Sequence, residues 1–74
     1  MNATPGPTRL ERYLRSRGIK PAHLAKESGV SRQHLLRVRM GRMEPTRPCM
    51  VAITTACRHL AQEQVRATDI FDLD

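Results

Sequence analysis

The sequence predicts an all-α fold, a compact bundle of about five short helices. Glycines and prolines interrupt the 74-residue chain at short intervals, and the apolar residues between them recur three and four positions apart, as on one face of a helix. No stretch alternates polar and apolar residues for long enough to predict a strand. A chain of this length with 39% hydrophobic residues forms one domain with a thin core.

The first helix follows a short segment that contains two prolines and a glycine. We expect residues 1–7 to be a flexible arm and residues 8–74 to form the single domain. Thr8 and Glu11 have the spacing of a capping box, in which the hydroxyl and the carboxylate each accept a hydrogen bond from a free amide of the first turn. Gly18 ends this helix. Its inward residues are Leu10, Tyr13 and Leu14.

The second and third helices are short and are separated by a glycine. Pro21 suits the first turn of the second helix, where its missing N–H costs no hydrogen bond, and Gly29 ends that helix. Ser31 is the predicted N-cap of the third helix, residues 31–40, which ends at Gly41. The inward residues are Leu24 and Ala25 in the second helix and Leu35 and Val38 in the third.

The fourth helix follows a loop at residues 44–48 and is predicted to open at Pro48. Its apolar face consists of Cys49, Ile53, Ala56 and Leu60. Thr68 and Asp69 have the residue types that cap a helix, so they predict a final short turn. That turn contains Ile70, Phe71 and Leu73.

The two cysteines are predicted to be small core residues in a reducing compartment. Cys49 and Cys57 lie about 12 Å apart along one helix, which is too far for a disulfide. No Cys and His spacing matches a zinc pattern, so we expect no metal. The acids are scattered and there is no glycine-rich phosphate loop, so we expect neither an enzyme nor a cofactor. Without a membrane-spanning run or a secretory signal, the expected location is cytoplasmic.

Charge is the strongest global indication of a partner. The chain has 13 Lys and Arg against seven Asp and Glu, a formal net charge of +6. All 13 cations but only four acids lie in residues 1–66, so that stretch carries +9 and the remaining residues carry −3. A small domain this basic usually binds a polyanion.

Residues 21–41 have the spacing of a helix-turn-helix. Two helices that cross steeply through a short turn approach closely, which requires a small residue, here Ala25, on the inner side of the first helix. Gly29 accepts the positive φ that the turn requires. Val30 fills the corner between the helices. The positions that anchor the second of these helices to the core are Leu35 and Val38.

The segment AHLAKESGVSRQHLLRVRMG, residues 22–41, resembles the motif of the phage repressor and Cro type (XRE-like) of helix-turn-helix proteins. The first helix, the ACRHL stretch at 56–60 and the DIFDL stretch at 69–73 are similar to further segments of that family. Lys20 and Pro21 depart from its frequent Thr/Ser-Gln pair. The resemblance implies a lambda-repressor-like DNA-binding domain, and hence a sequence-specific regulator of transcription, with a repressor expected.

The outward face of helix 31–40 contains the side chains that we expect to read DNA. With Leu35 and Val38 inward, a helical wheel places Arg32, Gln33, Leu36, Arg37 and Met40 outward. Arginine bonds guanine, glutamine bonds adenine, and leucine can contact a thymine methyl in the major groove. The family places base contacts at the positions of three of these residues, which are Arg32, Gln33 and Arg37. We therefore expect base contacts from Arg32, Gln33, Arg37 and Leu36.

A second group of residues is expected to contact phosphates. The resemblance implies that Arg42 and Arg47 follow the recognition helix beside the DNA backbone. Ser31 is expected to offer its hydroxyl or its amide at the helix N-terminus, and Lys20 and His34 are flanking candidates. Arg39 lies at the edge of the core, where pairing with an acid and contacting DNA are equally good interpretations.

One helix-turn-helix reads few base pairs, so members of the family usually dimerise on a palindromic operator. The segment expected to form a homodimer surface contains Val65, Ile70, Phe71 and Leu73. The alternative is that Phe71 and Ile70 fold back as a lid on the core, which for Phe71 is the stronger expectation, and one segment can serve both roles. An alternative function is an antitoxin or accessory module that binds a protein partner and keeps a DNA-binding helix-turn-helix.

Overall fold

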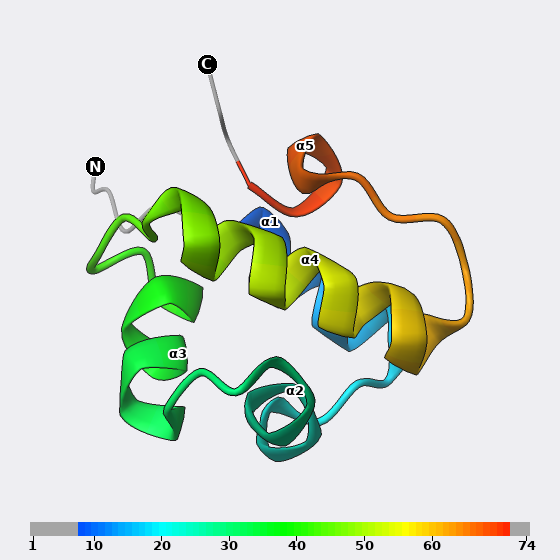
Figure 1. The fold of residues 1–74 in the computed structure, drawn as a ribbon, viewed down its shortest axis with the longest axis horizontal. Coiled ribbons are helices and arrows are strands. Elements are labelled where there is room, and N and C mark those ends of the chain that lie inside the picture. Colours follow the sequence, from blue (N-terminus) through cyan, green and yellow to red (C-terminus); the bar gives the residue numbers. More distant parts are fainter. Residues whose placement is uncertain (1–7, 72–74) are drawn as a thin grey trace, which may run out of the picture.

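The computed structural model describes residues 8–71, and these residues form five helices and no strand (Figure 1). The helices are α1 (Arg9–Arg17), α2 (Pro21–Ser28), α3 (Arg32–Arg39), α4 (Arg47–Ala61) and α5 (Ala67–Ile70). The predicted all-α class and helix number are therefore confirmed. The arm predicted at residues 1–7 lies outside the described residues. None of the helices is long and apolar enough to cross a membrane.

Helix α1 begins and ends at the predicted residues, but only half of its predicted capping box forms. The Thr8 hydroxyl accepts a hydrogen bond from the Glu11 amide at 3.2 Å, and Gly18 ends the helix with a φ of 66°. The Glu11 carboxylate does not turn back to its own helix start. It pairs instead with Arg39 at the end of α3, because a guanidinium is a stronger partner for a carboxylate than an amide is.

The α2–α3 connection has the predicted helix starts and ends. Pro21 is the first residue of α2, and Gly29 follows the helix with a φ of 77°. The Ser31 hydroxyl then accepts a hydrogen bond from the His34 amide at 3.1 Å and caps α3. Figure 1 shows α2 nearly end-on while α3 runs across the view, so the two helix axes cross steeply.

Helices α4 and α5 both begin earlier than predicted. Thr46 caps α4 by accepting a hydrogen bond from the Cys49 amide at 3.4 Å, so Pro48 is the second residue of the helix and not the first. In α5, the Asp69 carboxylate accepts a hydrogen bond from the Arg66 amide at 2.9 Å. Residue 68, predicted to be a cap, is therefore inside α5.

The core lies where α1, α2, α4 and α5 meet, with α4 running through the middle of the molecule (Figure 1). The predicted inward positions of α2 and α3 are buried, and Val30 packs against them while half-buried. On α4, Cys49 and Leu60 are only half-buried, whereas Cys57 is completely buried. The buried apolar residues are Leu10, Leu14, Leu24, Ala25, Leu35, Val38, Ile53, Ala56, Cys57, Val65, Ile70 and Phe71.

The predicted dimer surface is wrong for Val65 and Ile70, and the stronger expectation for Phe71, a lid on the core, is confirmed. Val65 and Ile70 are each 1% exposed and Phe71 is 7% exposed, so all three belong to the core of the single chain. Phe71 folds back onto the core as a lid, as expected. Because a domain of this size has little apolar area to bury, its C-terminal segment is needed to complete the core. Leu73 lies outside the described residues.

Candidate functional site

The outward face of α3 is the part of the molecule where exposed side chains of the predicted types gather. Leu35 and Val38 are 1% and 4% exposed and fix which side of the helix meets the core. The opposite side therefore projects into solvent, as the helical spacing requires. The exposed residues on it are Arg32, Gln33, Leu36, Arg37 and Met40.

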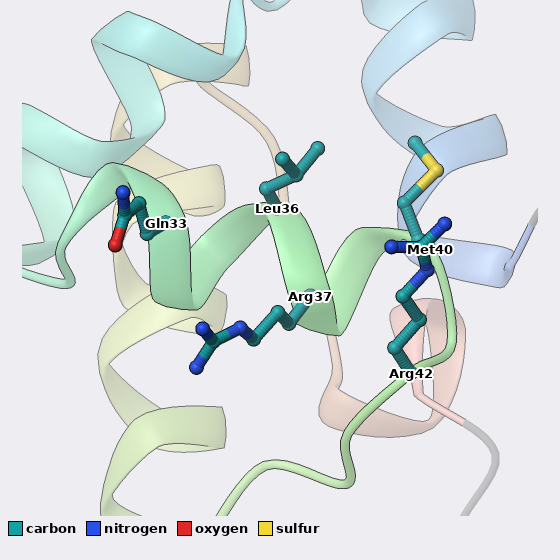
Figure 2. Close-up of a pocket in the computed structure, with 5 residues that line it drawn as sticks. All are labelled: Gln33, Leu36, Arg37, Met40 and Arg42. Carbon is teal, nitrogen blue, oxygen red and sulfur yellow. The ribbon is translucent and has the colours of Figure 1, made fainter.

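An open hollow of about 400 Å³ lies against this face (Figure 2). It is lined by Gln33, Leu36, Arg37, Met40 and Arg42. Three of the four predicted base-contacting residues therefore share one surface with Arg42, which was predicted to contact phosphate. Arg32, the fourth, is exposed at the start of α3 and does not line the hollow.

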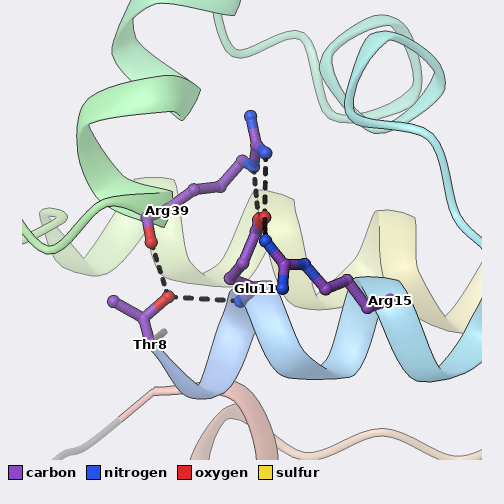
Figure 3. A network of polar contacts seen from close by, with 4 residues as sticks. All are labelled: Thr8, Glu11, Arg15 and Arg39. Carbon is purple, nitrogen blue, oxygen red and sulfur yellow. Dashed lines mark hydrogen bonds and ion pairs between the residues drawn. The ribbon is translucent and has the colours of Figure 1, made fainter. Parts of the chain in front are cut away.

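The end of α3 is fixed to the start of α1 by a two-point ion pair (Figure 3). Arg39 donates from Nε to Glu11 Oε1 at 2.7 Å and from Nη2 to Glu11 Oε2 at 3.1 Å. Both side chains are largely removed from solvent, at 15% and 8% exposed. The hydrogen bonds from Arg39 hold the pKa of the Glu11 carboxyl below its ordinary value, against the opposing effect of burial.

Thr8 adds a second link between the same two helices. Its hydroxyl donates to the Arg39 carbonyl oxygen at 2.7 Å while accepting the Glu11 amide (Figure 3). Its methyl carbon would lie 3.3 Å from a Cβ placed on Gly41, whose φ is 73°. We call Thr8, Glu11 and Arg39 the α1–α3 clamp, because they join the start of α1 to the end of α3.

Sequence reasoning missed the clamp as a unit. From the sequence, either an acid or DNA could be the partner of Arg39, and in the structure its partner is the acid Glu11. The available signal was Glu11 itself, an acid three positions before the core residue Leu14 and therefore on the inward side of α1. A buried acid requires a cation, but the sequence alone does not identify which of 13 cations it is.

The remaining predicted phosphate contacts lie around α3 in different settings. The Ser31 hydroxyl is occupied as the helix cap, although the side chain is exposed. His34 is half-buried, and its Nε2 lies 3.7 Å from Cys49 Sγ on the α4 side. Lys20 is exposed immediately before α2, and Arg47 is exposed as the first residue of α4.

The arginines fall into two groups according to their partners. Away from the outward face of α3, several arginines bond within the chain, to Glu11, Glu63 or backbone carbonyls. These are Arg9, Arg15, Arg17, Arg39 and Arg58. On the outward face of α3, in the loop after it and at the start of α4, Arg32, Arg37, Arg42 and Arg47 form no ion pair with any residue between 8 and 71. Other cations, such as Arg12 and Arg66, also form none, so the α3 side is distinguished by the position of its arginines beside Gln33 and Leu36.

The possible metal ligands and the two thiols are described by their grouping and their pKa values. Residues 8–71 contain no group of three metal-ligating side chains. Both cysteines are free, and burial raises the pKa of the Cys57 thiol to about 11 and also raises that of Cys49. At neutral pH both are therefore protonated thiols, which are poor nucleophiles and poor metal ligands.

Comparison with known proteins finds no match. No family model, no curated protein and no solved structure matches the chain. The functional interpretation therefore depends on the chemistry of the α3 surface.

Proposed function

We propose that the chain is a sequence-specific regulator of transcription that binds double-stranded DNA, with α2 and α3 acting as a helix-turn-helix and α3 entering the major groove. The observation that carries the proposal is the outward face of α3, where exposed arginines without internal partners adjoin Gln33 and Leu36 around an open hollow. Arginine, glutamine and leucine together can contact guanine, adenine and the thymine methyl.

The dimensions and charge of the α3 surface support this proposal. An α-helix with its side chains is about 10–12 Å across, and the major groove of B-DNA is about 12 Å wide. Arg42 in the loop after α3 and Arg47 at the start of α4 are exposed and available to neutralise phosphates flanking the groove. The α1–α3 clamp joins the end of α3 to the start of α1, and such cross-links favour pre-organisation of a binding helix.

We further propose that the protein is a repressor that binds as a dimer to a palindromic operator. One short helix reads few base pairs, and two copies related by a twofold axis double the number of contacts. The predicted dimer surface is part of the core, so a dimer would require another surface. Symmetry in the bound DNA would report the dimer directly.

The test is selection of bound sites from random double-stranded DNA, followed by affinity measurements on the selected site. We expect an inverted repeat to be enriched. Arg32→Ala, Gln33→Ala and Arg37→Ala should each weaken binding by about 1–3 kcal/mol and relax preference at one base position. Arg66→Ala, before α5, removes the same charge from an exposed site and should leave the preference unchanged. Unaltered preference in all three α3 variants would refute the base contacts.

A protein-binding function is the second candidate, because several large apolar side chains are exposed. These are Leu36, Met40, Met43 and Val51. An antitoxin or accessory subunit could use such residues to bind a protein partner and still retain DNA binding. Failure to enrich any DNA sequence, together with tight and stoichiometric binding to a protein encoded beside this one, would favour the second function over the first.

A further inference from the structure

We propose that Leu36 and Met40 form a methyl-reading stripe, which selects DNA sites carrying pyrimidine C5-methyl groups at two neighbouring positions. The inference rests on the proposed function and specifies which DNA the α3 surface prefers. The stripe is defined by these two residues alone.

The first support is the placement of the two side chains. Leu36 is 48% exposed and Met40 is 47% exposed, and both line the hollow. Residues four positions apart on a helix are neighbours on one face, so the two side chains project on the same side of α3 and its C-cap. Figure 2 shows both projecting toward the same edge of α3. Met43 and Val51 are also exposed, but they do not line the hollow.

The second support is the polar frame of the stripe. Gln33, Arg37 and Arg42 line the same hollow, and no acid does. A cationic frame around an apolar strip disfavours a second copy of this chain, because it would bring the same positive charge to the contact. The frame favours a polyanion that also carries apolar groups. The major groove provides both, since phosphates line its edges and thymine methyls project from its floor.

The spacing of the stripe limits the spacing of the methyl groups. Leu36 and Met40 are about 6 Å apart along the helix axis, since each residue rises about 1.5 Å. Successive base pairs rise about 3.4 Å. The two methyl groups should therefore lie no more than two base-pair steps apart. We expect the selected half-site to contain two thymines at this spacing, beside a guanine bonded by Arg37.

Replacing thymine by uracil tests the stripe, because uracil lacks only the C5-methyl group and keeps every hydrogen-bonding edge. Each thymine of the selected site is replaced singly, and the dissociation constant is measured for the intact protein at fixed salt. In each half-site we expect two positions at which uracil weakens binding about fourfold, the effect of one buried carbon, and no effect elsewhere.

Variants then assign each methyl group to a side chain. On Leu36→Ala, uracil at one sensitive position should cause no further loss, and Met40→Ala should behave likewise at the other. Val51→Ala is the matched control, since it removes an exposed apolar side chain outside the hollow and should retain both uracil effects. Circular dichroism confirms that the exposed substitutions leave the fold intact.

The outcomes separate the inference from the proposed function. If selection enriches no sequence, the proposed function fails and the stripe fails with it. If a sequence is enriched and every uracil substitution is without effect, the regulator remains and the stripe is refuted. If Leu36→Ala and Met40→Ala leave DNA affinity unchanged but abolish binding to a protein, the apolar strip is a protein-docking surface and the inference is overturned.

Discussion

Gly29 and Gln62 both have positive φ at a helix end, and they should respond to substitution in opposite directions. Gly29 has a φ of 77° and no atom within 4 Å of where a Cβ would lie, so an added side chain meets only backbone strain. Gln62 has a φ of 55° and already bears that strain at the end of α4. Left-handed backbone costs a non-glycine residue about 1–2 kcal/mol.

Gly29→Ala should therefore destabilise the fold by about 1–2 kcal/mol, whereas Gln62→Gly should stabilise it by up to about 1 kcal/mol. Urea unfolding followed by circular dichroism measures both free energies. In each case the change acts through the backbone, so affinity for the selected DNA should be unchanged under conditions where the variant is fully folded. A stable Gly29→Ala protein that no longer binds DNA would show that Gly29 contacts the ligand.

At the scale of elements, α3 depends on its ion pair with α1. Arg39→Met leaves the Glu11 carboxylate buried with only the exposed Arg15 as an ionic partner, 3.3 Å away. We expect a loss of about 1–3 kcal/mol in the free energy of unfolding, the cost of a poorly satisfied buried group. Arg15→Met is the matched control, because it removes the other guanidinium on the same carboxylate. Since the Arg15 side chain is 69% exposed, its removal should cost less than about 1 kcal/mol.

The same pair predicts how stability depends on pH. Because the folded state lowers the pKa of Glu11 below its ordinary value of 4.5, the pair contributes its full stabilisation above that pH. The contribution declines as pH falls through 4.5 toward the lower pKa of the folded state. Glu11→Gln should therefore be less stable than the parent at pH 7, and the difference should narrow in acid. Unfolding curves at neutral and acidic pH measure it, and a difference that widens in acid would contradict the assignment.

Helix ends could be predicted from sequence where a single residue determines them, and not where two residues compete. Gly18, Gly29 and Ser31 each act through their own backbone or hydroxyl, and the structure has each in its predicted role. The start of α4 differs from the prediction because the Thr46 hydroxyl accepts a hydrogen bond from the Cys49 amide. Thr46 therefore caps the helix two residues before Pro48. Glu11 pairs with Arg39, 28 positions away, and not with the amide of its predicted capping box. Local residue spacing does not predict such a long-range partner.

For the candidate site, the sequence predicted which face of α3 is exposed, because that follows from the burial of Leu35 and Val38. It did not predict that the hollow would join Arg42 to that face, since the loop path after Gly41 depends on tertiary contacts. Val65 and Ile70 were assigned to a dimer surface because they are apolar, although a core this thin requires them.

At the scale of the whole molecule, exposed cations differ in where they lie relative to α3. Arg32, Arg37 and Arg42 lie on α3 and in the loop after it and form no ion pair between residues 8 and 71, whereas on α1 Glu11 pairs with Arg15 and Glu63 with Arg17. In Figure 1, α3 and α5 lie at opposite sides of the molecule, so a cation beside α5 is far from the proposed groove. Arg42, Arg47 and Arg66 are all exposed; Arg42 lines the hollow against α3, Arg47 begins α4, and Arg66 precedes α5.

This asymmetry predicts the salt dependence of DNA binding. Each phosphate that the protein neutralises releases counterions and adds about 0.9 to the steepness of log affinity against log salt. Arg42→Ala and Arg47→Ala should each flatten the slope by about that amount and weaken specific and random DNA alike, because phosphates carry no sequence information. Arg66→Ala removes the same charge and should leave the slope nearly unchanged. Affinity titrations from low to moderate salt, on the selected DNA and on random DNA, measure both the slope and the loss of affinity. If Arg42→Ala alters the selected sequence with no change in slope, Arg42 reads bases in the hollow that it shares with Arg37, and the phosphate assignment is wrong there.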